Sequence, residues 1–139
     1  MTNEDEINRC MMVVEQCKQQ MNQLEMQAQY IQAAIMDYNK AKITLEKLSE
    51  IDTETDMIIP IGGGIFIDTT AKKAGKPLVD VGSGIVVEKN YEDAIKKIDE
   101  RIKEIEKSQT KLEEMMQQIQ AEATEADAKA QKLMGGQQG

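Results

Sequence analysis

The residues best suited to chemistry in this 139-residue chain are Cys10 and Cys17, since the sequence contains no histidine and no further cysteine. They lie one heptad apart, which on a helix is two turns, or roughly 10 Å along the axis. That distance is too long for a disulfide within the helix. Two cysteines without a histidine also supply too few ligands for a zinc site within one chain. We therefore predict that both are small apolar residues of a helix–helix seam in a reducing compartment.

Two glycine clusters, Gly62-Gly63-Gly64 and Gly82-Ser83-Gly84, suggest a second kind of chemistry, a phosphate-binding loop. Neither fits the P-loop pattern, because the first lacks the lysine and hydroxyl residue and both open into a β-branched run instead of a helix. Tight turns that need positive φ explain both clusters better. The many carboxylates lie along solvated helix faces. We predict no catalytic residues, no metal, no cofactor and no enzyme activity.

The elements that must position these motifs are two heptad repeats of nearly equal length around the glycine-rich middle. The first seam consists of Ile7, Cys10, Val14, Cys17, Met21, Leu24, Ala28, Ile31, Ile35, Tyr38, Lys42 and Leu45. The second consists of Tyr91, Ile95, Ile98, Ile102, Ile105, Gln109, Leu112, Met116, Ile119, Ala123, Ala126, Ala130 and Leu133. Only Lys42 and Gln109 are polar interruptions. A repeat of 3.5 residues sustained this long predicts a left-handed coiled coil, so the expected fold is mainly α, a long antiparallel coiled-coil hairpin.

Composition agrees with an elongated helical chain. Only 3% of residues are aromatic, too few for the core of an ordinary globule, and 30% are charged. The net charge of −8 argues against binding nucleic acid, which favours a basic surface. No apolar run is long enough to span a bilayer, and the N-terminal segment MTNEDEINRC is acidic instead of signal-like. We expect a soluble, cytoplasmic protein with no membrane partner.

Capping and turn signals set the expected boundaries of the elements. We predict a first helix over 5–50 with Thr2 or Asn3 as its N-cap, and a second helix over 90–134 with Asn90 as its N-cap. Gly135 and Gly136 are expected to stop the second helix and to leave a disordered tail over 135–139. The predicted strands are 57–61, 65–70, 78–81 and 85–88, with a polar turn over 71–76. They form two β-hairpins within 56–88 of a single domain, 1–139.

The predicted hairpins carry too much apolar surface for a monomer. An isolated two-stranded hairpin is marginal in water, and both faces of these strands are apolar. Strands of other chains must cover them, by closing a β-barrel, so we predict an assembly module; a private β-cap on a monomer is the alternative. The predicted subunit-interface residues are Ile58, Ile59, Ile61, Ile65, Phe66, Ile67, Leu78, Val79, Val81, Ile85, Val86 and Val87.

The paired chain ends form a second apolar feature. Residues 11–14 are four consecutive apolar residues, so some must project beyond the seam. Opposite them, Ala123, Ala126 and Ala130 make a thin seam that packs little area. We predict a soft apolar tip that binds non-native polypeptide; the alternative is that these residues only finish the coiled coil. The predicted client-binding residues are Ile7, Met11, Met12, Val13, Val14, Leu133 and Met134.

The hairpin motifs resemble a known family. The segments IPIGGGIFI at 59–67 and VGSGIVVEKNYEDA at 81–94 are similar to the prefoldin family, in particular to the α subunit of archaea. Two hairpins, where the β subunit has one, favour the α class. The architecture matches along the whole chain, whereas the specific motifs are confined to the hairpins and the start of the second helix.

The resemblance implies a function. In the prefoldin family two α and four β subunits join through their hairpins into a double β-barrel, and the tips of six coiled coils hold unfolded polypeptide clients for a group II chaperonin, without ATP. The resemblance therefore implies an α2β4 hexamer with prefoldin β subunits as partners. One alternative is a structural coiled-coil tether or scaffold that binds a specific folded partner. A second alternative, from another class, is an enzyme or nucleotide-driven machine, against which the absence of histidine and of a Walker motif argues.

Overall fold

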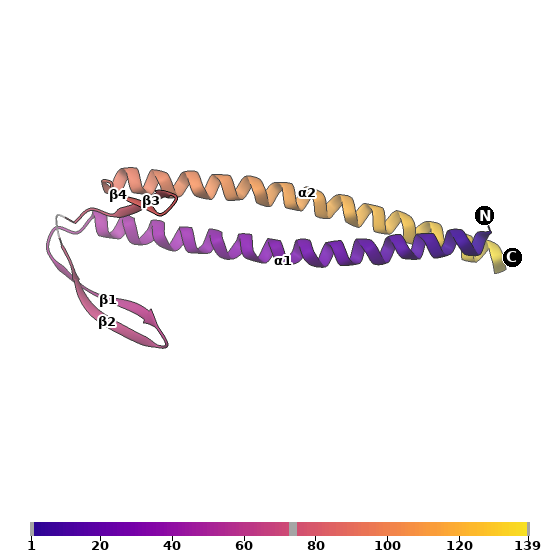
Figure 1. Cartoon of the computed structure of the whole chain (residues 1–139), viewed down its shortest axis with the longest axis horizontal. Coiled ribbons are helices and arrows are strands. Elements are labelled where there is room, and N and C mark those ends of the chain that lie inside the picture. The colour runs from indigo at the N-terminus through magenta and orange to yellow at the C-terminus, as the bar shows by residue number, and fades with distance from the viewer. Residues whose placement is uncertain (1, 73–74, 139) are drawn as a thin grey trace. The chain divides into compact units, whose positions relative to one another are not determined.

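The computed structural model describes residues 2–72 and 75–138, and it has two long helices with two small β-hairpins between them (Figure 1). The elements in chain order are α1 (Asn3–Ser49), β1 (Thr55–Gly62), β2 (Ile65–Ala71), β3 (Leu78–Gly82), β4 (Ile85–Glu88) and α2 (Tyr91–Gln138). The predicted mainly α fold is confirmed. The chain divides into two compact units, which we call unit 1 (Met1–Ala34 with Ile105–Gly139) and unit 2 (Ile35–Glu104). Both long helices contribute to both units, and the single-domain interpretation stays a prediction.

Unit 1 is a pair of antiparallel helical segments, with the first turns of α1 beside the last turns of α2 (Figure 1). Thr2 caps α1: its Oγ1 accepts a hydrogen bond from the Asp5 N–H at 3.2 Å, and its own N–H donates to Asp5 Oδ2 at 3.4 Å. This reciprocal cap satisfies backbone donors that the first helical turn leaves free. The buried side chains of unit 1 are Ile7, Cys10, Cys17, Leu24, Leu112 and Ala130.

The predicted seam is confirmed along both helices, because every one of its residues is buried or half-buried. Each polar interruption has a partner on the other helix. In unit 1, Gln109 Nε2 donates to Gln32 Oε1 at 3.4 Å. In unit 2, Lys42 Nζ lies 2.8 Å from Asp99 Oδ1. The seam therefore contains two polar cross-helix pairs, which an antiparallel pairing in another register would separate.

The hairpins of unit 2 follow from their turns. In β1–β2, Ile59 lies opposite Ile67, and in β3–β4, Val79 lies opposite Val87. The turn residues 62–64 and 82–84 all have positive φ, and Ser83 at 54° is the non-glycine among them. Left-handed backbone is open to glycine without steric penalty, which is why both turns are glycine-rich. The prediction that these clusters form tight turns is confirmed.

Of the predicted boundaries of α2, the N-cap was confirmed and the C-terminal end was not. Asn90 caps α2 as predicted, since its Oδ1 accepts the Asp93 N–H at 2.7 Å. The predicted stop at Met134 was wrong: α2 continues through Gly135 and ends at Gln138. Glycine weakens a helix by about 1 kcal/mol relative to alanine but does not forbid it, and it stops a helix only where it turns left-handed. The last residue of the predicted tail, 139, and residues 73–74 of the predicted polar turn lie outside the described residues.

Candidate functional surfaces

The hairpins of unit 2 present a large apolar surface to solvent. Ten of the twelve predicted interface residues are between 43% and 67% exposed, namely Ile58, Ile59, Ile61, Ile65, Phe66, Ile67, Leu78, Val81, Ile85 and Val86. In β1–β2 the exposed residues occupy both faces, because Ile59 pairs with Ile67 whereas Pro60 pairs with Phe66. Exposed apolar area of this extent is typical of a protein–protein interface.

Val79 and Val87 are the two exceptions, and they show how the second hairpin is attached. Val79 is only 9% exposed and lies with Ala94 and Ile98 of α2 around an apolar hollow. Val87, its cross-strand partner, is half-buried. One face of β3–β4 therefore packs within the chain, and Val79 belongs to the core of unit 2. A contact between Val79 and another subunit stays a prediction, although Ala94 and Ile98 already lie beside this side chain.

Hydrogen bonds order β3–β4 and tie it to α2. The Arg101 guanidinium donates to the Asp80 carbonyl oxygen, which ties the hairpin to the third turn of α2. The Asp80 carboxylate accepts the Gly82 N–H at 2.8 Å and so orders the turn. At the base of the hairpin, the Lys89 N–H donates to the Pro77 carbonyl at 3.1 Å. The outward face of this hairpin, with Leu78 and Val86, is thus presented on a fixed support.

The predicted tip residues divide into three groups. Met11, Met12 and Met134 are exposed, by 59%, 71% and 44%. Val13, Val14 and Leu133 are half-buried. Ile7 is 8% exposed and lies inside the helix pair, so client contact through Ile7 stays a prediction that requires the helix ends to part.

The seam beneath the tip is made of small residues. A shallow hollow there is lined by the small or apolar residues Cys10, Val13 and Ala126 and by the charged residues Arg9, Glu122, Glu125 and Lys129. Alanine buries little area, so the last turns of α2 are less firmly held than a leucine-rich seam would hold them.

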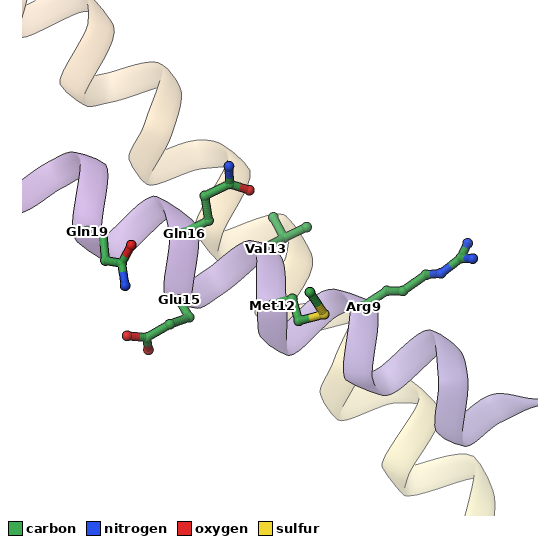
Figure 2. A pocket seen from close by; sticks show the side chains of 6 residues that line it. All are labelled: Arg9, Met12, Val13, Glu15, Gln16 and Gln19. Carbon is green, nitrogen blue, oxygen red and sulfur yellow. The ribbon is translucent and has the colours of Figure 1, made fainter.

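A second hollow lies on the surface of α1 alone (Figure 2). Met12 and Val13 are its apolar residues, and the others that line it are Arg9, Glu15, Gln16 and Gln19. Figure 2 shows Val13 and Gln16 on one side of the helix and Glu15 and Gln19 on the other. The four polar residues were missed from the sequence because they occupy solvated heptad positions. No signal in the heptad pattern marks them.

The cysteines are buried free thiols in the seam of unit 1, as predicted. Burial raises the pKa of the Cys17 thiol above its usual 9.0, and the negative charge of Glu122 raises it further. A protonated, buried thiol is a poor nucleophile and a poor metal ligand. Within residues 2–72 and 75–138, no cluster of three or more histidine, cysteine, aspartate or glutamate side chains is arranged to hold a metal. Over the same described part of the chain, neither helix has a stretch apolar enough to cross a membrane.

Comparison with known proteins shows the family of this chain. A family model described as Prefoldin subunit matches residues 17–136, which is most of the chain. The chain belongs to the prefoldin family. Its resemblance to archaeal prefoldin α subunits is likewise confirmed, and the chain is a prefoldin chaperone subunit.

The relatives span nearly the same length as this prefoldin chain. Prefoldin subunit alpha of Archaeoglobus fulgidus is 32% identical over 88% of this chain and 90% of its own length. The corresponding subunit of Methanobrevibacter smithii is 28% identical over 100% of this chain and 94% of its own. Among solved structures, a chain of filamentous PFD from Methanocaldococcus jannaschii matches with a TM-score of 0.71 and 24% identity, over 84% of this chain and 96% of that one. The structural likeness establishes the prefoldin fold.

Proposed function

We propose that this chain is the α subunit of an ATP-independent cytoplasmic chaperone that captures unfolded polypeptides and passes them to a group II chaperonin. The observation that carries the proposal is the exposure of Met11, Met12 and Met134 at the paired ends of unit 1. Methionine is flexible and polarizable, and it adapts to many apolar sequences. The seam at this end of unit 1 contains Ala123, Ala126 and Ala130, which bury little area and therefore hold the helix ends less firmly than larger side chains would.

Assembly raises the affinity of the tips for a client. A contact that buries about 100–200 Å² contributes roughly 2.5–5 kcal/mol, which alone gives very weak binding. Several tips held on one scaffold raise the effective concentration of each for a client already bound by another. We propose that the ten exposed hairpin residues form that scaffold with prefoldin β subunits, in an α2β4 hexamer. The PFD that this chain resembles in fold is filamentous and so forms an assembly, and the exposed apolar hairpin residues of this chain support assembly through the hairpins.

Release of the client needs no chemical step. Each tip contact is weak, so it breaks and re-forms quickly, and a chaperonin with greater affinity removes the client. The seam thiols and the solvated carboxylates take no part in this cycle.

The experiment replaces the exposed methionines while keeping the helix. A variant with Met11→Gln, Met12→Gln and Met134→Gln retains good helix formers at solvent-exposed positions. We expect it to assemble normally and to lose most of its ability to suppress aggregation of chemically denatured citrate synthase. The matched control is Met115→Gln, because Met115 is 49% exposed on α2 of the same unit but far along the chain from the tip. Protection by the triple variant equal to that of the control would show that the tip is not the client site.

The same measurement addresses the tether alternative. A tether binds one folded partner with fixed stoichiometry, so its helices need no affinity for denatured proteins. If neither the parent nor the Met115→Gln control suppresses aggregation of any denatured protein, the tether explanation replaces the chaperone proposal.

A further inference from the structure

Unit 1 exposes apolar side chains on the outer face of α1, on the side opposite the seam. Met12, Met26 and Tyr30 are 71%, 57% and 72% exposed. Met12 and Met26 are two heptads apart, so they share one side of the helix, and Tyr30 follows one turn later on that side. The hollow of Figure 2 occupies the start of this face. We call the face from Met12 to Tyr30 the α1 track.

Arg9 and Glu15 line the start of the track, and beyond them it carries few charges. Residues 16–34 contain two charged residues, Lys18 and Glu25, and eight carboxamides, namely Gln16, Gln19, Gln20, Asn22, Gln23, Gln27, Gln29 and Gln32. Lys18 and Glu25 are one heptad apart and flank the seam, away from the track. Over unit 1 as a whole the two helices carry similar numbers of charges, seven in residues 2–34 and ten in residues 105–138, so the low charge is a local property of residues 16–34. Solvation alone does not require this neutral surface, because charges serve it equally well.

We propose that the α1 track is a second binding surface for unfolded polypeptide, continuous with the tip; the proposal rests on the proposed chaperone function. Methionine and tyrosine provide apolar contact, and the tyrosine hydroxyl can hydrogen-bond to water or to the bound chain at a solvent-exposed site. Carboxamides both donate and accept hydrogen bonds, which suits the free N–H and C=O groups of an extended chain. Since the whole chain carries −8, a face with few charges also admits acidic segments that a strongly acidic face would repel.

The size of the track favours a transient occupant over a permanent subunit. Its three large apolar side chains present on the order of 400 Å², whereas a stable interface takes roughly 800 Å² from each partner. The 18 residue steps from Met12 to Tyr30 extend about 27 Å along the helix. An extended polypeptide covers that distance with about eight residues. The track therefore holds one short apolar segment of a client whose next segment reaches the tip.

The test compares paired substitutions in the purified oligomer of full-length chains. The track variant carries Met26→Gln and Tyr30→Gln, and the tip variant carries Met11→Gln and Met134→Gln; Met115→Gln is the control. The readout is the affinity for fluorescently labelled, reduced and carboxymethylated α-lactalbumin, which stays unfolded in buffer. We expect the track variant to bind about three- to tenfold more weakly than the control.

The outcomes separate the two proposals. If the tip variant loses affinity and the track variant binds like the control, the α1 track is not a client surface and the proposed function stands. If the track variant loses affinity and the tip variant does not, the track is the client surface and the tip assignment fails. Unchanged binding by both variants overturns both.

Crosslinking keeps the test informative if a variant assembles poorly. Tyr30→p-benzoylphenylalanine retains an apolar ring at a solvent-exposed position, and the same photoreactive group at Met115 is its control. On irradiation, a product between position 30 and the α-lactalbumin probe, absent for position 115, supports the track. A product formed only with a neighbouring subunit shows that the face is a subunit contact and overturns the proposal.

Discussion

The exposed isoleucines that begin β2 and β4 allow a quantitative test of assembly. Ile65 and Ile85 are 58% and 59% exposed in the chain. Full burial of an isoleucine side chain contributes about 1.5–3 kcal/mol, so hiding the remaining surface on assembly contributes about 1–2 kcal/mol each. An aspartate at the same place removes that gain and adds the penalty of an unpaired buried carboxylate, several kcal/mol. Together Ile65→Asp and Ile85→Asp are expected to weaken each subunit contact by about 5 kcal/mol or more, over a thousandfold in affinity.

The assay measures mass and folding separately. Light scattering after size exclusion is expected to show monomers for the double variant, and far-UV circular dichroism is expected to show the helix content of the parent. Both isoleucines are exposed within the chain, and exposed substitutions change stability by about 0.5 kcal/mol or less. The matched control is Ile43→Asp, because Ile43 is 53% exposed in the same unit but lies on α1. Normal assembly of the double variant, or equal loss of assembly in the control, would refute the hairpin interface.

Three further predictions concern the seam. The pKa of Cys17 is raised in the fold, so its contribution to stability is complete below the usual thiol pKa of 9.0 and is lost as pH rises through the folded-state pKa. Between pH 8 and 10 the urea midpoint of the parent should therefore fall more than that of Cys17→Ala. Equal falls in the two proteins would contradict the raised pKa. The hydrogen bond to Asp99, and then its charge, raise the pKa of Lys42 above 10.5, so the pair stabilises below pH 10.5 and less above it. Asp99→Asn should therefore lower the urea midpoint at pH 8, and a midpoint unchanged there would refute the pairing. Leu112 is 5% exposed, so Leu112→Ala should lower the free energy of unfolding by about 2–4 kcal/mol in urea titration, where a loss under 1 kcal/mol would show that the helices repack.

Sequence periodicity predicted the seam fully because it is a property of each helix alone. The partners of its polar residues were not predictable in the same way. Lys42 pairs with Asp99, and Gln109 pairs with Gln32. These pairs follow from the register between the two helices, which the heptad pattern of one helix does not contain. The predicted end of α2 was wrong because glycine lowers helix stability by only about 1 kcal/mol, which does not by itself end a helix.

The candidate surfaces were predictable to the extent that they break a pattern. The tip was found because residues 11–14 are consecutively apolar. Alternation along β3 did not reveal which face its own helices cover, so Val79 was grouped with exposed residues although Ala94 and Ile98 bury it. Met26 and Tyr30 were overlooked because a heptad analysis examines the seam and treats the opposite side as solvated. Only their exposure in the folded chain identifies them.

The two polar pairs of the seam constrain which insertions this chain can accept without losing a pair. From Gln32 to Lys42 is ten residues forward along α1, and from Gln109 to Asp99 is ten residues back along α2. An insertion of seven residues in one helix alone, between its two polar residues, preserves the heptad phase but breaks one pair. Insertion of a heptad into both helices preserves both pairs and lengthens the helix pair by about 10 Å. A heptad inserted in both helices therefore keeps both polar pairs, whereas a heptad inserted in one helix does not.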